Sequence, residues 1–135
     1  MIFVDSSFWI AARLRRESRH DEAVQLLGQS QSEALVTSNQ VRGETWTFLR
    51  RRDGHRGAVA YLRMLESTPR IRVERIPDVL EEEALAWLRR RGEREYSFVD
   101  ATSFALMRSL RIKEALAFDG DFAAAGFVEL RAETA

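Results

Sequence analysis

Four acidic residues of this chain raise the question of what balances their charge: Asp5, Glu44, Asp100 and Asp119. Asp100 is the clearest case, because it lies among apolar neighbours in the stretch YSFVDATSFA. Burying a lone carboxylate is costly, so each acid needs a cation, a hydrogen-bonding partner or a structural role. Several carboxylates in one cleft raise each other's pKa values, and a bound cation relieves that repulsion. We therefore expect the four acids to meet.

A shared acidic cleft predicts a hard divalent cation, Mg²⁺ or Mn²⁺, since both ions prefer oxygen ligands. Such an ion keeps part of its water shell, activates a water molecule and stabilises the charge that develops on a phosphoryl group. This chemistry suits the hydrolysis of phosphate esters, with one ion or with two ions about 4 Å apart.

Each acid also has a local explanation. Asp100 forms the pattern S-x-x-D with Ser97, a variant capping box at a helix start. Asp119 and Gly120 are a common turn pair. Asp5 could cap the helix that follows it, and Glu44 could be a solvated surface residue.

Short apolar runs alternate with helical patterns along the sequence. Strands are expected at 2–4, 34–37, 71–76, 115–118 and 127–130, and helices at 7–14, 20–27, 38–52, 55–65, 77–92 and 97–110. This alternation predicts a three-layer α/β/α sandwich with a mainly parallel central sheet. With no linker or repeat in the sequence, we expect a single domain over residues 1–135.

The predicted fold places the acids at one edge of the sheet. Sites in parallel sheets lie off the carboxyl ends of the strands. Asp5 and Asp119 each follow a predicted buried strand directly. Glu44 and Asp100 are expected in the first turns of helices, which can face the same edge.

Composition narrows the possible classes of protein. The 135 residues are 45% hydrophobic and 31% charged, as in a globular protein. The chain has no cysteine, which excludes disulfides and thiolate chemistry. No apolar run approaches a membrane span, and Asp5 ends the apolar start too early for a secretory signal. These features favour the cytoplasm.

The charge distribution is uneven although the formal net charge is zero. That balance argues against a globally basic protein that binds DNA directly. Lys113 is the only lysine among 21 basic residues. The arginines cluster at 13–19, 50–52 and 89–91, and their planar guanidinium groups suit phosphate recognition. Solvated helix ends are the simpler interpretation of any one cluster.

Four sequence blocks, in order, resemble a known family. They are MIFVDSSFWIA, VTSNQVRGETWTFLRRRDG, YSFVDATSFALM and ALAFDGDFAAAGF. Together they span most of the chain and are similar to the motifs of PIN-domain proteins, above all the VapC toxins of bacterial VapBC toxin–antitoxin pairs.

The resemblance implies an Mg²⁺- or Mn²⁺-dependent endoribonuclease that leaves a 5′-phosphate. Asp5, Asp100 and Asp119 match the family's metal ligands. Glu44 matches an acid that binds the metal or orients the attacking water. All four would therefore be catalytic residues.

Other matched positions have supporting roles. Ser6 and Ser97 are similar to hydroxyl residues that position the neighbouring acids or the substrate. Asp121 could share the role of Asp119. The sequence departs from the family at Ala117, where a threonine is usual, and the lost hydroxyl could weaken metal binding.

The resemblance also implies partners: an RNA substrate, a VapB-like antitoxin that inserts an arginine or lysine among the acids, and a second copy in a homodimer. Helix faces bearing Trp9 and Trp46 are candidates for holding the antitoxin. A housekeeping PIN-domain RNA-processing nuclease and a degenerate, non-catalytic PIN domain that binds RNA or protein are the alternatives. A phosphoacceptor signalling domain fits less well, because it needs two acids after its first strand and a lysine after its last.

Overall fold

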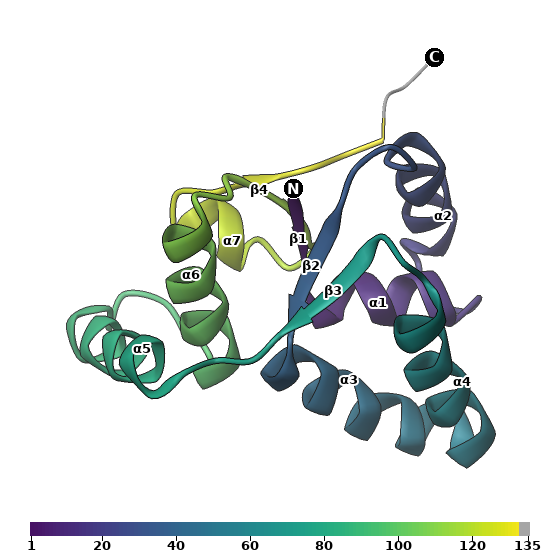
Figure 1. The fold of residues 1–135 in the computed structure, drawn as a ribbon, viewed down its shortest axis with the longest axis horizontal. Helices are drawn as coiled ribbons and strands as arrows, with labels where there is room; N and C mark the ends of the chain where they lie inside the picture. The colour runs from purple at the N-terminus through teal and green to yellow at the C-terminus, as the bar shows by residue number, and fades with distance from the viewer. Residues whose placement is uncertain (133–135) are drawn as a thin grey trace.

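The computed structural model describes residues 1–132. Strands and helices alternate along this part of the chain (Figure 1). The strands are β1 (Ile2–Val4), β2 (Leu35–Ser38), β3 (Ile71–Glu74), β4 (Glu114–Leu116) and β5 (Val128–Glu129). The helices are α1 (Ser6–Arg13), α2 (His20–Gln29), α3 (Asn39–Arg52), α4 (Gly54–Ser67), α5 (Asp78–Arg90), α6 (Phe98–Leu110) and α7 (Asp121–Ala124).

The five strands form one sheet in the order β3-β2-β1-β4-β5, and every strand pairing is parallel. Phe3 in the central strand lies in register with Val36 on one side and Ala115 on the other. Because all strands run the same way, their carboxyl ends lie at one edge of the sheet. The predicted mainly parallel sheet is confirmed.

Helices cover both faces of the sheet. Figure 1 shows α1, α2 and α4 on one side and α5, α6 and α7 on the other, with α3 running along the edge where β2 ends. The buried residues of β1 and β4 are all apolar because both faces of these strands are covered, while β2 ends in the buried polar residues Thr37 and Ser38. This arrangement confirms the predicted α/β/α sandwich. The predicted single domain extends to residues 133–135, which lie outside the described residues.

Two helices begin immediately after their strands. Asp5 is the N-cap of α1, and its side chain accepts a hydrogen bond from the Ser7 backbone N–H. Ser38 ends β2 and caps α3 by accepting from the Val41 N–H. The N–H of Asp5 also donates to the Leu116 carbonyl at 3.0 Å, so the end of β1 is fixed beside the end of β4.

The structure corrects three details of the sequence analysis. Glu44 lies in the second turn of α3, which begins at Asn39, and not in the first turn as expected. Asp119 does not follow its strand directly, since β4 ends at Leu116. Trp9 is 1% exposed and packs edge-on against Tyr61, so it cannot hold a partner protein. Trp46 is only partly buried.

The helix α7 was not predicted, because four residues are too few to show a helical period. The strand expected at 71–76 is present as β3, which ends at Glu74 and is only partly buried. Among residues 1–132, no helix is long and apolar enough to cross a membrane.

Candidate metal centre

Asp5 is almost fully buried, at 1% exposure, at the carboxyl end of β1. Its Oδ2 accepts hydrogen bonds from the Ser7 backbone N–H at 3.2 Å and from the Ser7 hydroxyl at 2.8 Å. Its Oδ1 is buried and has no hydrogen-bonding partner within the described residues. Burial, followed by the negative charges of Asp119 and Asp100, raises the pKa of Asp5 to about 8 despite the hydrogen bonds from Ser7, which lower it.

Asp100 occupies the first turn of α6 and forms the predicted capping box. The Ser97 hydroxyl accepts from the Asp100 N–H at 2.9 Å, and Oδ2 of Asp100 accepts from the Ser97 N–H at 3.0 Å. Burial raises the pKa of Asp100 to about 6, with smaller contributions from the charges of Asp121 and Asp119. The box thus fixes a largely desolvated carboxylate at the start of α6.

Asp100, Asp119 and Asp121 come together. One carboxylate oxygen from each lies within 4.8 Å of the others, a spacing that could hold a metal ion. The pKa of Asp119 is raised to about 6 by lost solvation and by the carboxylates of Asp121 and Glu129. The structure therefore adds Asp121 to Asp119 as a full member of the cluster.

The turn that carries Asp119 and Asp121 has a left-handed residue at its centre. Gly120 has φ 83°, a conformation that glycine adopts without steric cost. A side chain there would also approach Nη2 of Arg94, 3.1 Å from the position of an added Cβ. The turn is further closed by a hydrogen bond from the Asp121 N–H to Oδ1 of Asp119 at 3.1 Å.

Arg94 holds the outer side of this turn. Its Nε donates to Oδ1 of Asp121 at 2.6 Å, and its Nη2 donates to the Asp119 carbonyl at 3.2 Å. The sequence analysis missed Arg94, because the contact joins residues 27 positions apart and nothing in the local pattern distinguishes this arginine from its neighbours.

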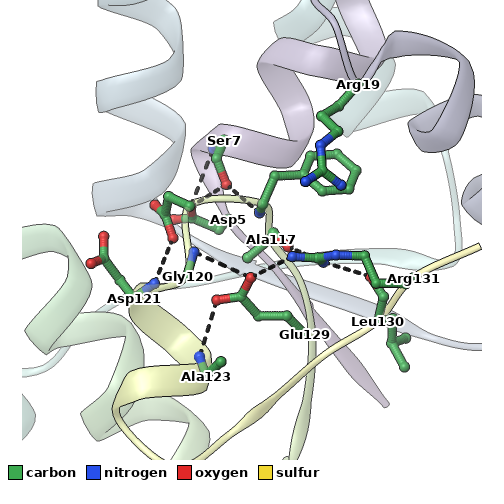
Figure 2. A network of polar contacts seen from close by, with 12 residues as sticks. Asp5, Ser7, Arg19, Ala117, Gly120, Asp121, Ala123, Glu129, Leu130 and Arg131 are labelled. Atoms are coloured by element: carbon green, nitrogen blue, oxygen red, sulfur yellow. Dashed lines mark hydrogen bonds and ion pairs between the residues drawn. The ribbon is translucent and has the colours of Figure 1, made fainter.

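Glu129 holds the same turn from β5, as Figure 2 shows. Oε1 of Glu129 accepts from the Gly120 N–H at 3.3 Å and from Nη2 of Arg131 at 2.9 Å, while Oε2 accepts from the Ala123 N–H at 3.0 Å. The carboxylate is 3% exposed. Glu129 was also missed, although an acid inside the apolar run Phe127–Leu130 is a usable signal for a buried role.

Ser7 and Phe118 connect β1 to the loop after β4. The Ser7 hydroxyl, which donates to Asp5, accepts from the Phe118 N–H at 3.0 Å. The Phe118 ring is contacted by two guanidinium groups, those of Arg19 and Arg131, each centred 5.3 Å from the ring centroid (Figure 2). Ser7 therefore fixes Asp5 relative to the strand that leads to Asp119.

Glu44 lies apart from the aspartate cluster. It is exposed on α3, and the hydroxyl of Ser6 donates to its Oε1 at 2.5 Å. Ser6 and Glu44 line a hollow of about 820 Å³ together with Val99, the neighbour of Asp100. The structure thus connects Glu44 to the site through Ser6 and does not place it in the three-aspartate cluster.

The sequence profile of the PIN domain matches residues 2–128. The chain belongs to the PIN-domain family. It is 56% identical over 133 residues to the "23S rRNA-specific endonuclease VapC20" of Mycobacterium tuberculosis, in both strain CDC 1551 / Oshkosh and strain ATCC 25618 / H37Rv, and the alignment covers 98% of this chain and 100% of that protein.

A crystal structure of Mycobacterium tuberculosis VapC20, described as a sarcin–ricin loop cleaving toxin, has the same fold. The TM-score is 0.91 at 54% identity, and the match covers 97% of this chain and 99% of that chain. The resemblance to VapC-type PIN domains found in the sequence is therefore confirmed.

The residues of this PIN domain fit a divalent metal ion. The donor set consists of carboxylate oxygens, which Mg²⁺ and Mn²⁺ prefer. Oδ1 of Asp5 is buried without a hydrogen-bonding partner among residues 1–132, and burial together with neighbouring carboxylates raises the pKa values of Asp5 and Asp100. A cation near these carboxylates would relieve both features.

Ala117 of this PIN domain is fully buried, and its carbonyl accepts from Nη1 of Arg131 at 2.9 Å. The bond fixes the backbone of the loop after β4. Ala117 has no hydroxyl, unlike the threonine that is usual at this position. Its effect on metal affinity stays a prediction.

Proposed function

We propose that this chain is a divalent-metal-dependent endoribonuclease that acts as the toxin of a VapBC-type pair and cuts 23S rRNA in the sarcin–ricin loop. The observation that carries the proposal is the buried Asp5, with its unpartnered oxygen, beside the three-aspartate cluster. The substrate is taken from the VapC20 proteins, to which this chain is similar over nearly its whole length.

In this proposal, Asp5, Asp100 and Asp119 hold Mg²⁺ or Mn²⁺, and Asp121 contributes a further oxygen. When bound, the ion would activate a water nucleophile and neutralise the charge that develops on the phosphoryl group. Glu44 accepts from Ser6 and faces the adjoining hollow, where it can orient a water molecule or the RNA.

The protein's own hydrogen bonds prepare the site for this reaction. Ser97 and Ser7 each hold one oxygen of an aspartate, which orients the carboxylate before a cation arrives. Glu129 and Arg94 both fix the turn of Asp119 and Asp121 through hydrogen bonds. Preorganised groups of this kind lose little entropy when the substrate binds.

The proposed protein is a single domain over residues 1–135 that functions in the cytoplasm. Its partners are an RNA substrate, a VapB-like antitoxin and a second copy in a homodimer, with no direct DNA contact. The antitoxin follows from the VapC family, because an uninhibited ribonuclease would damage its own cell.

The direct test is to incubate the purified protein with ribosomes and map cuts in 23S rRNA by primer extension. We expect one dominant cut in the sarcin–ricin loop with Mg²⁺ or Mn²⁺, and none with EDTA. Asp5→Asn should lower the cleavage rate by a factor of about 10² or more, as expected for loss of a charged group that acts only in the reaction.

Asp21→Asn is the matched control, since Asp21 is exposed in the first turn of α2. It should cut at the wild-type rate. Cleavage that persists in EDTA or in Asp5→Asn would contradict the metal mechanism. Cuts scattered over many RNAs would favour the housekeeping nuclease, and metal binding without any cleavage would favour a non-catalytic domain.

A further inference from the structure

A second hollow, of about 530 Å³, lies where the loop after α1 approaches the turn between α3 and α4. Most of its polar lining is guanidinium. The lining residues are Arg13, Leu14, Arg15, Arg16, Glu17, Arg52 and Asp53. We call this hollow the arginine pocket.

The carboxylates of Glu17 and Asp53 also line this pocket, but they form no ion pair with its arginines. Within residues 1–132, no ion pair involves Arg13, Arg15, Arg16 or Arg52. Arg52 stacks on the Phe48 ring, with its guanidinium carbon 5.1 Å from the ring centroid, and this contact leaves its N–H donors free for a ligand. With four arginines and two acidic residues in its lining, the pocket carries a net positive formal charge.

The arginine pocket adjoins the hollow that Ser6 and Glu44 line. Arg52 lines both, and the larger hollow reaches from Arg51 and Arg52 to Ser6 and Glu44. Both hollows follow α1, whose ends at Ser6 and Arg13 are about 10 Å apart at the helical rise of about 1.5 Å per residue. A polynucleotide of a few residues spans that length.

We propose that the two hollows form one RNA-binding track, in which the arginine pocket holds backbone phosphates of the substrate at a distance from the cut. This inference rests on the proposed function and names the residues that hold the RNA. The need for such a pocket follows from the charge at the site. The aspartates repel phosphate, and a protein with no net charge offers no general attraction.

Phosphate is the ligand that this pocket favours. Guanidinium groups donate in a planar fork that matches phosphate oxygens, and contacts to the backbone position a nucleic acid without reading its sequence. An acidic protein segment would have no reason to continue along the hollow toward Glu44 and the aspartate cluster, where it would meet like charge. A phosphodiester that is to be cut must reach that cluster.

The test compares two pairs of exposed arginines that carry the same charge. Arg15→Gln/Arg16→Gln removes two groups from the pocket, and Arg89→Gln/Arg90→Gln removes two from the end of α5, on the far side of the sheet (Figure 1). Both pairs are placed in the Asp5→Asn protein so that no RNA is cut. Affinity for a fluorescein-labelled 20-nucleotide RNA is measured by anisotropy in EDTA at several KCl concentrations.

We expect the pocket pair to weaken binding by at least about tenfold at 100 mM salt and the control pair by less than about twofold. The slope of log affinity against log salt should fall by about 1.4 for the pocket pair, since each lost contact to a single strand accounts for about 0.7. If the pocket pair lowers the melting temperature, Arg16→Gln and Arg90→Gln replace the two pairs, with about fivefold expected for Arg16→Gln.

Equal effects of the two pairs, no effect of either, or no RNA binding at all would overturn the track. Binding of an acidic protein that depends on Arg15 and Arg16, with RNA affinity unchanged, would overturn it in favour of a protein-binding surface. Failure of the proposed function is seen separately. If the wild-type protein binds RNA through Arg15 and Arg16 but cuts none, the RNA-binding track is supported and the nuclease function is contradicted.

Discussion

Asp5 shows at the scale of one residue how a structural role and a chemical role can share a side chain. Oδ2 caps α1 through Ser7, while the buried Oδ1 has no partner among the described residues. In Asp100, likewise, Oδ2 has the structural role, because it accepts a hydrogen bond in the capping box. The local explanation and the shared-site explanation of these acids are therefore compatible, and the sequence patterns that predicted each were both informative.

The raised pKa of Asp5 predicts how the metal-free protein responds to pH. Its folded pKa of about 8 lies above the ordinary value of 3.8, so the folded state binds this proton more tightly than the unfolded state does. The contribution of this bound proton to the free energy of unfolding is fully present below about pH 4 and is lost as the pH rises to about 8. Across that range, the free energy of unfolding of Asp5→Asn should rise relative to that of the wild type by up to about 1.4 kcal/mol per pH unit.

Urea unfolding in EDTA at pH 5, 6.5 and 8 measures this difference. Asp21→Asn, the exposed control, should follow the wild type at each pH. Excess Mn²⁺ at pH 7.5 should raise the melting temperature of the wild type and hardly that of Asp5→Asn. A constant loss of stability in Asp5→Asn at every pH would mean that Asp5 is a structural cap alone.

At the scale of elements, what the sequence could predict depends on the range of the contacts. The strands around Phe3 and Val36 and the capping box of Ser97 and Asp100 were predictable, because apolar runs and caps are local patterns. The hydrogen bonds between Glu129 and the turn after β4 were not predictable, since they depend on which strand pairs at the edge of the sheet.

The same limit applies to Asp121 and to Glu44. Asp121 joins the cluster because the short helix α7 begins at that residue, and no period reveals a helix of four residues. Glu44 was expected in the first turn of its helix, although a start near residue 38, which the structure confirms, places it in the second turn. An error of one turn is enough to move a side chain from the centre of a site to its rim.

Glu129→Gln tests whether β5 positions the metal-binding turn. The amide keeps the shape of the carboxylate, but its NH₂ group must face one of three donors: the Gly120 N–H, the Ala123 N–H or the Arg131 guanidinium. We expect the free energy of unfolding to fall by about 1–3 kcal/mol. Hydrogen exchange at the Gly120 and Ala123 amides should become faster in the folded protein.

Glu114→Gln is the control for this prediction, because Glu114 is exposed on β4 in register with β5. It should leave both the unfolding free energy and the two exchange rates unchanged. Unchanged exchange in Glu129→Gln would show that the turn is held without this carboxylate, with Arg94 as the remaining contact from another element.

At the scale of the whole molecule, the formal net charge is zero, but acidic and basic side chains gather in separate regions. The aspartates gather at the carboxyl edge of the sheet, and four arginines that form no ion pair within residues 1–132 line the pocket near the end of α1. An anionic substrate is attracted by the arginines and requires a cation at the aspartates. A protein that inhibits the enzyme can supply that cation from its own arginine or lysine.

The last prediction is that the antitoxin and the metal exclude each other. If a basic side chain of the antitoxin lies among Asp5, Asp100 and Asp119, bound antitoxin must weaken metal binding, and bound metal must weaken antitoxin binding by the same factor. Mn²⁺ should therefore raise the melting temperature of the free protein but leave that of the purified complex nearly unchanged. Co-expression of the antitoxin should also relieve the growth arrest that the wild type causes alone. A complex that gains the full Mn²⁺ shift would show that the antitoxin inhibits from outside the aspartate cluster, with the arginine pocket as the next surface to test.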